Sequence, residues 1–400
     1  MKPAPRGGEL LTYCTLVGLV AYAAIATDLY LPAIPYMIND LGASEAEGQL
    51  TLSIFMVGLA LGQLIFGPLS DQFGRLPVVR AGTVCFIFTS ALCAIASDMG
   101  LMWVMRGLQG IAAASGPVIA RAIVRDRYEG NRAAQVMSAL SGAMAVIPML
   151  APSAGVLIMK FFAWPAIFVA LAGFGALILL ALARLPESAP APISERLTFG
   201  SVLGAFGEML SRRAFLGYQM AGSFSFAALF CYLSTVAFFL PDVFGIPTAL
   251  FGYAFAMTVL GFMTGSLINA RVVVRYGLDN TLRAGLLISL TSALAIALLS
   301  HNAAQFMPVM ALLSCLFFLG VGLTAANASM GAISLFRERA GAASAVYGFT
   351  HALLASAIGA LAGELYRGRL IEPALIILAC ALLAISGLAL TRSSQTAKET

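Results

Sequence analysis

The chain has 400 residues, of which 60% are hydrophobic and only 10% are charged, with a net charge of +5 and a mean hydropathy of +0.93. Soluble domains carry roughly 25% charged residues, so a chain of this length and composition would lack the polar groups to cover its surface in water. These values exclude a soluble globular protein and predict one whose solvent is mostly the lipid bilayer.

Apolar stretches of about 20 residues recur along the whole chain, each long enough to cross about 30 Å of hydrocarbon. Because the bilayer offers no water to backbone groups, these segments are expected to be helices. We predict an all-α membrane protein with twelve transmembrane helices, at 10–37, 49–70, 78–97, 101–123, 135–159, 163–185, 214–240, 249–271, 281–300, 305–335, 342–365 and 370–391.

The Lys and Arg residues gather on one side of this topology. If both termini are cytoplasmic, all but four of the 23 basic residues fall in cytoplasmic loops and tails; the exceptions are Lys160, Arg367, Arg369 and Arg106. The positive-inside rule therefore predicts an even number of spans with both termini cytoplasmic. The positive net charge reflects this topology, so we expect no nucleic-acid partner.

The longest polar interruption, 186–213, separates six helices from six. It predicts an N-terminal bundle at 1–185, a cytoplasmic linker at 186–213, a C-terminal bundle at 214–391 and a cytoplasmic tail at 392–400. Short matches at equivalent positions indicate a diverged duplication with two pseudo-symmetric bundles: Arg80-Ala-Gly82 with Arg283-Ala-Gly285, Arg125-Asp-Arg127 with Arg337-Glu-Arg339, and Leu31-Pro32 with Leu240-Pro241.

The two halves differ in charge when they are aligned on these matches. Three charged residues of the first half then oppose apolar residues of the second: Asp28 falls on Ala237, Asp71 on Val274 and Arg106 on Phe318. We infer that any proton transfer belongs to the first half, which holds the charged groups, and that the second half supplies mostly shape and apolar surface.

Asp28 lies late in the first predicted helix, in Ala26-Thr-Asp28-Leu-Tyr-Leu-Pro32. Burying a charged side chain in a membrane helix costs roughly 2.5–3.5 kcal/mol on insertion scales, so Asp28 should face the bundle interior. A carboxyl that can be neutral or charged there can trade a proton against a substrate. The alternative places Asp28 at the outer membrane–water boundary, where it is merely solvated.

Arg106 opens Arg106-Gly-Leu-Gln109-Gly110 and is the only basic residue expected within the membrane. A buried guanidinium needs acceptors or a counter-charge, and Asp28 is the nearest acid by depth. We therefore expect the two to couple proton binding to movement. The alternative is an Arg side chain that extends to the outer surface.

A polar loop, Gly67-Pro-Leu-Ser-Asp71-Gln-Phe-Gly74-Arg75, separates the second and third predicted helices. Asp71 is suited to cap a helix N-terminus, where backbone N–H groups lack partners, and Arg75 is suited to pair with Asp126. Such contacts would close the cytoplasmic side of a transporter. The alternative is an ordinary short loop with solvated charges.

The fifth predicted helix contains Pro148, Pro152 and Gly155. Prolines leave backbone carbonyls free and kink a helix, and small residues let helices approach closely. Methionine and aromatic side chains suit varied apolar ligands, whereas His351, alone on an apolar helix, is expected to be packed. As substrate-lining residues we predict Thr27, Tyr30, Phe55, Gln109, Met144, Phe230 and Tyr232.

These motifs carry a resemblance. The spacing G-x-L-x-D-x-x-G-R is similar to the signature loop of the major facilitator superfamily, and R-x-x-Q-G to a signature of its drug:proton antiporters. With Thr27-Asp-Leu-Tyr-Leu-Pro32 and Gln49-Leu-Thr-Leu-Ser53, the chain resembles the Bcr/CflA drug-resistance subfamily. The likeness is dense over residues 20–170. The exporters' G-P-x-x-G-G pattern is only partly kept in Ala151-Pro152-Ser-Ala-Gly155-Val156.

The resemblance implies a major facilitator fold in the bacterial cytoplasmic (inner) membrane. It also implies proton-coupled export of small, largely apolar drugs by alternating access, with Asp71 approaching the eleventh helix. The expected partners are drugs, protons and lipid, with the protein acting as a monomer. No cofactor or metal is expected beyond the proton-motive force, because the six cysteines show no metal-ligand spacing.

Two other functions stay open at this point. A proton-coupled uptake symporter of a small solute would share the same fold. A membrane-embedded enzyme or sensor would need a nucleophile, base or metal cluster, and two widely spaced histidines supply none. The chain also has no G-x-x-x-x-G-K-[ST] loop for ATP, so we expect a protein that is not an enzyme.

Overall fold

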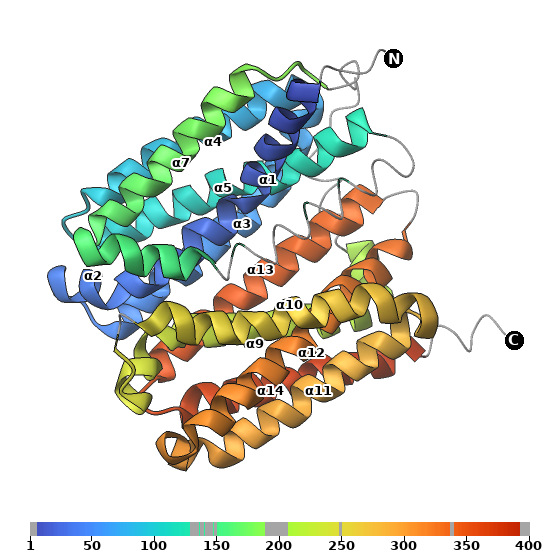
Figure 1. Cartoon of the computed structure of the whole chain (residues 1–400). Helices are drawn as coiled ribbons and strands as arrows, with labels where there is room; N and C mark the ends of the chain where they lie inside the picture. The colour runs from blue at the N-terminus through green and yellow to red at the C-terminus, as the bar shows by residue number, and fades with distance from the viewer. Residues whose placement is uncertain are drawn as a thin grey trace, which may run out of the picture. The chain divides into compact units, whose positions relative to one another are not determined.

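The computed structural model describes residues 6–128, 150–188, 207–247, 250–336 and 340–392, together with the single positions 136, 140 and 147. Every element in these ranges is helical (Figure 1). The first elements are α1 (Arg6–Asp28), η1 (Leu31–Ala33), α2 (Ile34–Asp40), α3 (Glu45–Phe73), α4 (Arg75–Ala94), α5 (Met99–Arg127) and α7 (Pro165–Ala183). They are followed by α9 (Arg213–Phe244), α10 (Phe251–Tyr276), α11 (Leu278–Leu299), η3 (Ser300–Phe306), α12 (Met307–Ser334), α13 (Ala340–Leu365) and α14 (Ile371–Arg392).

The described chain contains ten segments long and apolar enough to cross a membrane. One of them, Leu278–Ser334, comprises α11 and α12 joined by η3. About half of the fifth expected span, 135–159, lies outside the described residues, and a shorter apolar helix occupies Leu150–Phe161. The protein is therefore a multi-pass, all-helical membrane protein, while twelve spans and cytoplasmic termini stay predictions.

The first span differs from the continuous helix expected at 10–37. Helix α1 ends at Asp28, and a turn and η1 precede α2. The physical reason is proline, which has no backbone N–H to donate. Pro32 and Pro35 therefore leave the carbonyls of Asp28 and Leu31 without the N–H donors of a regular α-helix. The helix consequently ends at Asp28.

Contacts divide the chain into two units, one of Met1–Leu41 with Ile54–Leu197 and one of Gly42–Ser53 with Thr198–Thr400. In the first unit α4 packs on α5 and α7, and α1 packs on α5. In the second unit α9 packs on α13 and α14, while α12 packs on α10 and α11 (Figure 1). The expected boundaries at 185 and 214 stay a prediction.

The two units repeat one backbone feature at equivalent positions. Gly74 has φ 95° and ψ 157° between α3 and α4, and Gly277 has φ 79° and ψ 166° between α10 and α11. In the register that sets Asp71 on Val274, these glycines are counterparts. Residues with a Cβ rarely adopt such positive φ values, so both units use glycine to turn one membrane helix into the next.

Glycines also bring helix backbones together in each unit. A Cβ on Gly58 or Gly62 of α3 would strike the carbonyl oxygen of Gly107 or Ile111 in α5. In the second unit, Gly261 and Gly265 of α10 contact the carbonyl oxygens of Cys315 and Leu319 in α12 in the same way. We call these two contacts the glycine seams. Small residues four apart permit this close packing in membranes, where no hydrophobic effect drives helices together.

Candidate functional site

The interior of the first unit contains a guanidinium. Helix α5 begins after Asp98, whose carboxylate accepts a hydrogen bond from the Leu101 N–H at 2.9 Å, and two turns later Arg106 points inward with no exposed surface. Its Cζ lies 4.4 Å from the centre of the Phe55 ring, 4.8 Å from that of Tyr30 and 5.9 Å from that of Phe168. Aromatic faces attract cations at such distances, so Arg106 is held in an aromatic cage.

The hydrogen bonds of Arg106 extend this site into a polar chain. Its Nη1 donates to the Ala26 carbonyl at 3.2 Å and to Gln109 Oε1 at 2.5 Å, and Gln109 Nε2 donates to the Ser90 hydroxyl at 2.7 Å. Gln109 and Ser90 are fully buried. The Nε and Nη2 atoms of Arg106 are buried without a hydrogen-bond partner in the described residues. The cation is thus only partly compensated. Nothing in the sequence indicates this role for Ser90, because an isolated Ser in an apolar helix is not distinctive.

Asp28 is buried at the end of α1, with 4% of its surface exposed. This excludes the alternative of a solvated carboxylate in the present structure. The Thr27 hydroxyl lies 3.0 Å from its Oδ1. The expected Asp28–Arg106 ion pair is absent within the described helices, which corrects the sequence-based expectation: α1 ends at Asp28, and Arg106 binds the carbonyl of Ala26 instead.

This arrangement places two separately buried charges in one apolar unit. An isolated carboxylate among apolar groups carries a large desolvation cost, which binding of a proton removes. A guanidinium cannot be neutralised in that way, and its cost is reduced only by acceptors and rings. Asp28 is therefore the group of this site that can exchange a proton, while Arg106 supplies a permanent positive charge.

A second polar cluster surrounds Arg75, which starts α4 and is 3% exposed. Its Nε donates to Asp126 Oδ2 at 2.7 Å, and its Nη1 donates to the Ser70 hydroxyl at 2.8 Å and to the Asp71 carboxylate. The expected Arg75–Asp126 pair is thus present. Ser70 in turn donates to the Gly67 carbonyl at 2.9 Å. The role of this Arg75 cluster in closing the cytoplasmic side stays a prediction.

The cap of α4 is a residue that sequence analysis missed. The backbone N–H groups of Arg75 and Leu76 donate to the carboxylate of Glu187, at 3.1 and 2.9 Å. Asp71 binds the side chain of Arg75, and its capping of a neighbouring helix stays a prediction. Glu187 lies just after α7 and is more than 100 residues from α4 in sequence. No local sequence pattern therefore predicts this contact.

The resemblance of the loop 67–75 to the major facilitator signature implies a transporter, in which we expect Asp126→Asn to slow transport about tenfold, which corresponds to ~1.4 kcal/mol. Asn still accepts from Arg75 but removes one of the two negative charges, those of Asp71 and Asp126, that compensate a nearly buried guanidinium. Initial transport rates in vesicles and the melting temperature of the purified protein measure the two consequences. Glu364→Gln, the same kind of change at an exposed position, is the control. Parental rate and stability in Asp126→Asn would contradict this role.

The fifth helix approaches the break that follows Asp28. A Cβ on Gly155 would meet the Leu29 carbonyl oxygen and lie 2.8 Å from Pro32 Cγ, and Pro152 is buried. Gly155 therefore allows direct backbone contact beside Asp28. Pro148 and Met144, which were also predicted to matter, lie outside the described residues.

The predicted substrate-lining residues separate into two groups. Thr27, Tyr30, Phe55 and Gln109 all contact Asp28 or Arg106 in the first unit. Phe230 and Tyr232 belong to α9 in the second unit, where both are buried. His351 is packed as expected, its ring stacked on Phe226 at 4.2 Å and on Tyr347 at 5.5 Å.

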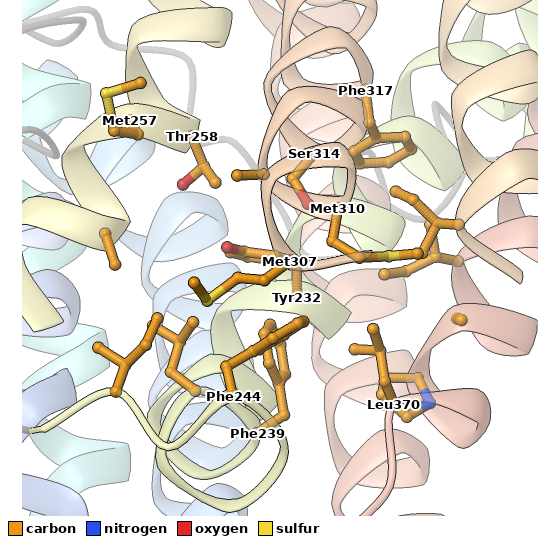
Figure 2. A pocket seen from close by; sticks show the side chains of 18 residues that line it. Tyr232, Phe239, Phe244, Met257, Thr258, Met307, Met310, Ser314, Phe317 and Leu370 are labelled. Carbon is orange, nitrogen blue, oxygen red and sulfur yellow. The ribbon is translucent and has the colours of Figure 1, made fainter. Parts of the chain in front are cut away.

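Tyr232 lines a cavity of about 120 Å³ within the second unit. Figure 2 shows side chains from α9, α10 and α12 converging on it, among them Tyr232, Thr258 and Ser314. Phe230 lies outside this lining and packs against Gly359 of α13. The second unit thus contains apolar space where the first contains charge.

A buried cation, a separately buried acid and helices of membrane-spanning length define a multi-pass membrane protein with polar groups inside its bundle. The sequence model of the Major Facilitator Superfamily matches residues 16–360 of the chain. The chain therefore belongs to this family of transporters.

Curated relatives cover most of the chain. It is 32% identical to an uncharacterized MFS-type transporter, YdgK, of Bacillus subtilis, over 90% of each chain. It is 30% identical to a bicyclomycin resistance protein homolog of Haemophilus influenzae and 32% identical to multidrug resistance protein MdtL of Citrobacter koseri, over 84% of each chain in both cases. These relatives support the subfamily resemblance.

Two solved structures share the fold. The human organic anion transporter MFSD10 matches with a TM-score of 0.67 and 18% identity, covering 97% of this chain and 100% of that one. The nucleoside transporter NupG matches with a TM-score of 0.72 and 13% identity, covering 95% and 99%. At such low identity the likeness concerns the fold alone.

Proposed function

We propose that this protein is a proton-coupled exporter of small, largely apolar drugs, acting in the bacterial inner membrane by alternating access. The observation that carries the proposal is the buried carboxyl of Asp28, which has a hydroxyl rather than a cation as its hydrogen-bond partner. The names of the bicyclomycin-resistance and MdtL relatives supply the substrate class. No cofactor is needed, because the proton-motive force supplies the energy.

The proposed cycle assigns one role to each buried charge. Protonated Asp28 favours a state open to the cytoplasm, drug binding promotes release of the proton, and the drug is then exposed outside, where a proton resets the carboxyl. Moving one proton down a potential of 100 mV supplies about 2.3 kcal/mol. Arg106 stays positive throughout, because a guanidinium is not deprotonated in proteins.

The test uses everted membrane vesicles with and without the protein, energised by respiration. Radiolabelled chloramphenicol, a sulfonamide and bicyclomycin are offered in turn at neutral pH. We expect at least one to accumulate inside the everted vesicles, with loss of accumulation when a protonophore is added. Loss of preloaded drug from these vesicles would identify a symporter of the uptake type, and no movement of any probe in either direction would contradict drug transport.

A further inference from the structure

The cavity of the second unit is almost entirely apolar. None of its 18 lining side chains is charged, and only three carry a hydroxyl, on Tyr232, Thr258 and Ser314. The remainder present aliphatic, aromatic or thioether groups, as Figure 2 shows for Phe239, Phe317 and Met310. An ion in this cavity would lose its hydration without gaining a counter-charge, which is strongly unfavourable. Its occupant must therefore be uncharged.

The size of the cavity limits its occupant further. Its volume is about 120 Å³, while an apolar cavity of about 150 Å³ in another protein stays dry and binds benzene. The space therefore fits a single six-membered ring and is too small for a polycyclic drug. Of the three lining hydroxyls, that of Thr258 donates to the Phe255 carbonyl at 2.7 Å and is hydrogen-bonded to that of Tyr232. The Ser314 hydroxyl therefore offers a hydrogen bond to one polar substituent on such a ring.

The walls differ in rigidity. Phe317 is 2% exposed and Met310 is 3% exposed, and Tyr232 is fixed by edge-on ring contacts with Phe239 at 5.3 Å and Phe318 at 5.1 Å. Met257 and Met307, by contrast, are about half exposed. Methionine side chains are flexible and polarizable, so these two can move aside for a ligand while the aromatic wall stays in place.

The repeat explains why this space lies in the second unit. Phe239, which lines the cavity, is the counterpart of Tyr30 in the register that sets Leu31-Pro32 on Leu240-Pro241. Phe318 takes the place of Arg106 and contacts Tyr232. The first unit thus surrounds a guanidinium with rings, whereas the second has rings alone at the corresponding positions, which accounts for the apolar character of the cavity walls.

We propose that this cavity is a binding site for an uncharged molecule with one aromatic ring and a single hydrogen-bonding substituent, such as a phenol. The site lies wholly within the second unit and contains neither Asp28 nor Arg106. Its occupancy does not depend on which solute the protein moves, so binding can be tested apart from transport.

The experiment measures binding of 4-fluorophenol to the purified full chain in detergent by fluorine NMR. A saturable component is expected that is absent from empty micelles. Fluorobenzene should compete for the site, whereas 4-fluorobenzyltrimethylammonium, with the same ring and a fixed positive charge, should bind at least about tenfold more weakly. Equal binding of the cation would overturn the proposal, and so would equally effective competition by 1-octanol, which has no ring.

Matched variants locate the binding. Ala254 lines the cavity on α10, so Ala254→Phe should fill it and weaken binding at least about tenfold, since a packed core has no spare volume. Ala270→Phe places the same ring on an exposed part of α10 and should leave affinity within about twofold. Unchanged affinity in folded Ala254→Phe would overturn the assignment.

A second variant keeps the test decisive if the filled cavity prevents folding. Ser314→Ala removes one hydroxyl without adding volume. It should weaken 4-fluorophenol about two- to tenfold, the effect of one hydrogen bond, and leave fluorobenzene unchanged. If both probes respond alike or neither responds, the hydroxyls do not select the substituent and the proposed ligand class is wrong.

Discussion

Replacing Asp28 by Asn is expected to lower proton-driven drug accumulation in everted vesicles about a hundredfold or more, equivalent to ~2.7 kcal/mol in an activation barrier. Asn has nearly the same shape and can still accept a hydrogen bond from the Thr27 hydroxyl, which lies 3.0 Å from Oδ1. It cannot bind and release a proton, however. The variant should therefore fold and bind drug, but its drug binding should no longer release protons into a weakly buffered solution.

Asp98→Asn is the matched control for this experiment. It makes the same chemical change in the same unit, but at an exposed position that caps α5, and Asn caps helices as well as Asp. Transport by this variant should equal that of the parent. If Asp28→Asn exports drug at the parental rate and with the parental pH dependence, Asp28 does not carry the proton and another buried group must do so.

Arg106→Met is expected to abolish transport while leaving the protein as stable as the parent or more stable. Arg106 has two buried nitrogens without partners in the described structure, and replacing buried ionic groups by apolar ones of similar size is often neutral or stabilising. Met also suits the space between Phe55 and Tyr30. Stability and function should therefore change in opposite directions, which transport rates and melting temperatures will show.

Arg106→Lys separates charge from geometry. Lys keeps the positive charge but has a compact ammonium in place of a planar guanidinium that can stack on several rings. We expect intermediate transport, reduced about tenfold. If Arg106→Met transports at the parental rate, transport does not require the guanidinium. If Arg106→Met fails to fold while Arg106→Lys is fully active, its role is structural rather than functional.

The fold class followed from the sequence because membrane helices are long and uniform. An apolar run of about 20 residues in lipid must form an α-helix, because its backbone groups have no water to bond. Short repeats such as Arg80-Ala-Gly82 align the two halves of the sequence. The turn glycines Gly74 and Gly277 then adopted matching conformations. The break after Asp28 was not anticipated, although Pro32 and Pro35 provide its cause.

The sequence identifies which polar residues are buried more readily than it identifies the groups that they contact. Buried Asp28 and Arg106 stand out in a sequence because charge is rare in apolar helices. Other members of the polar sites do not stand out. The Ala26 carbonyl, which accepts from Arg106, and Ser90, which accepts from Gln109, carry no unusual chemistry, and Glu187 caps α4 from more than 100 residues away in sequence. The Asp28–Arg106 pair was inferred from depth alone, and depth does not determine which way a side chain turns.

The glycine seams have a mechanical consequence. Where a carbonyl oxygen occupies the space that a Cβ would fill, two helices cannot slide past each other without first separating. Helices α3 and α5, and likewise α10 and α12, should therefore move as stiff pairs, and compliance must reside elsewhere. The same kind of contact lies beside a buried acid, where the Leu29 carbonyl oxygen, one residue beyond Asp28, occupies the space that a Cβ on Gly155 would fill. A proton that binds the Asp28 carboxyl would therefore act next to a tight backbone contact, and movement there would require the two segments to separate first.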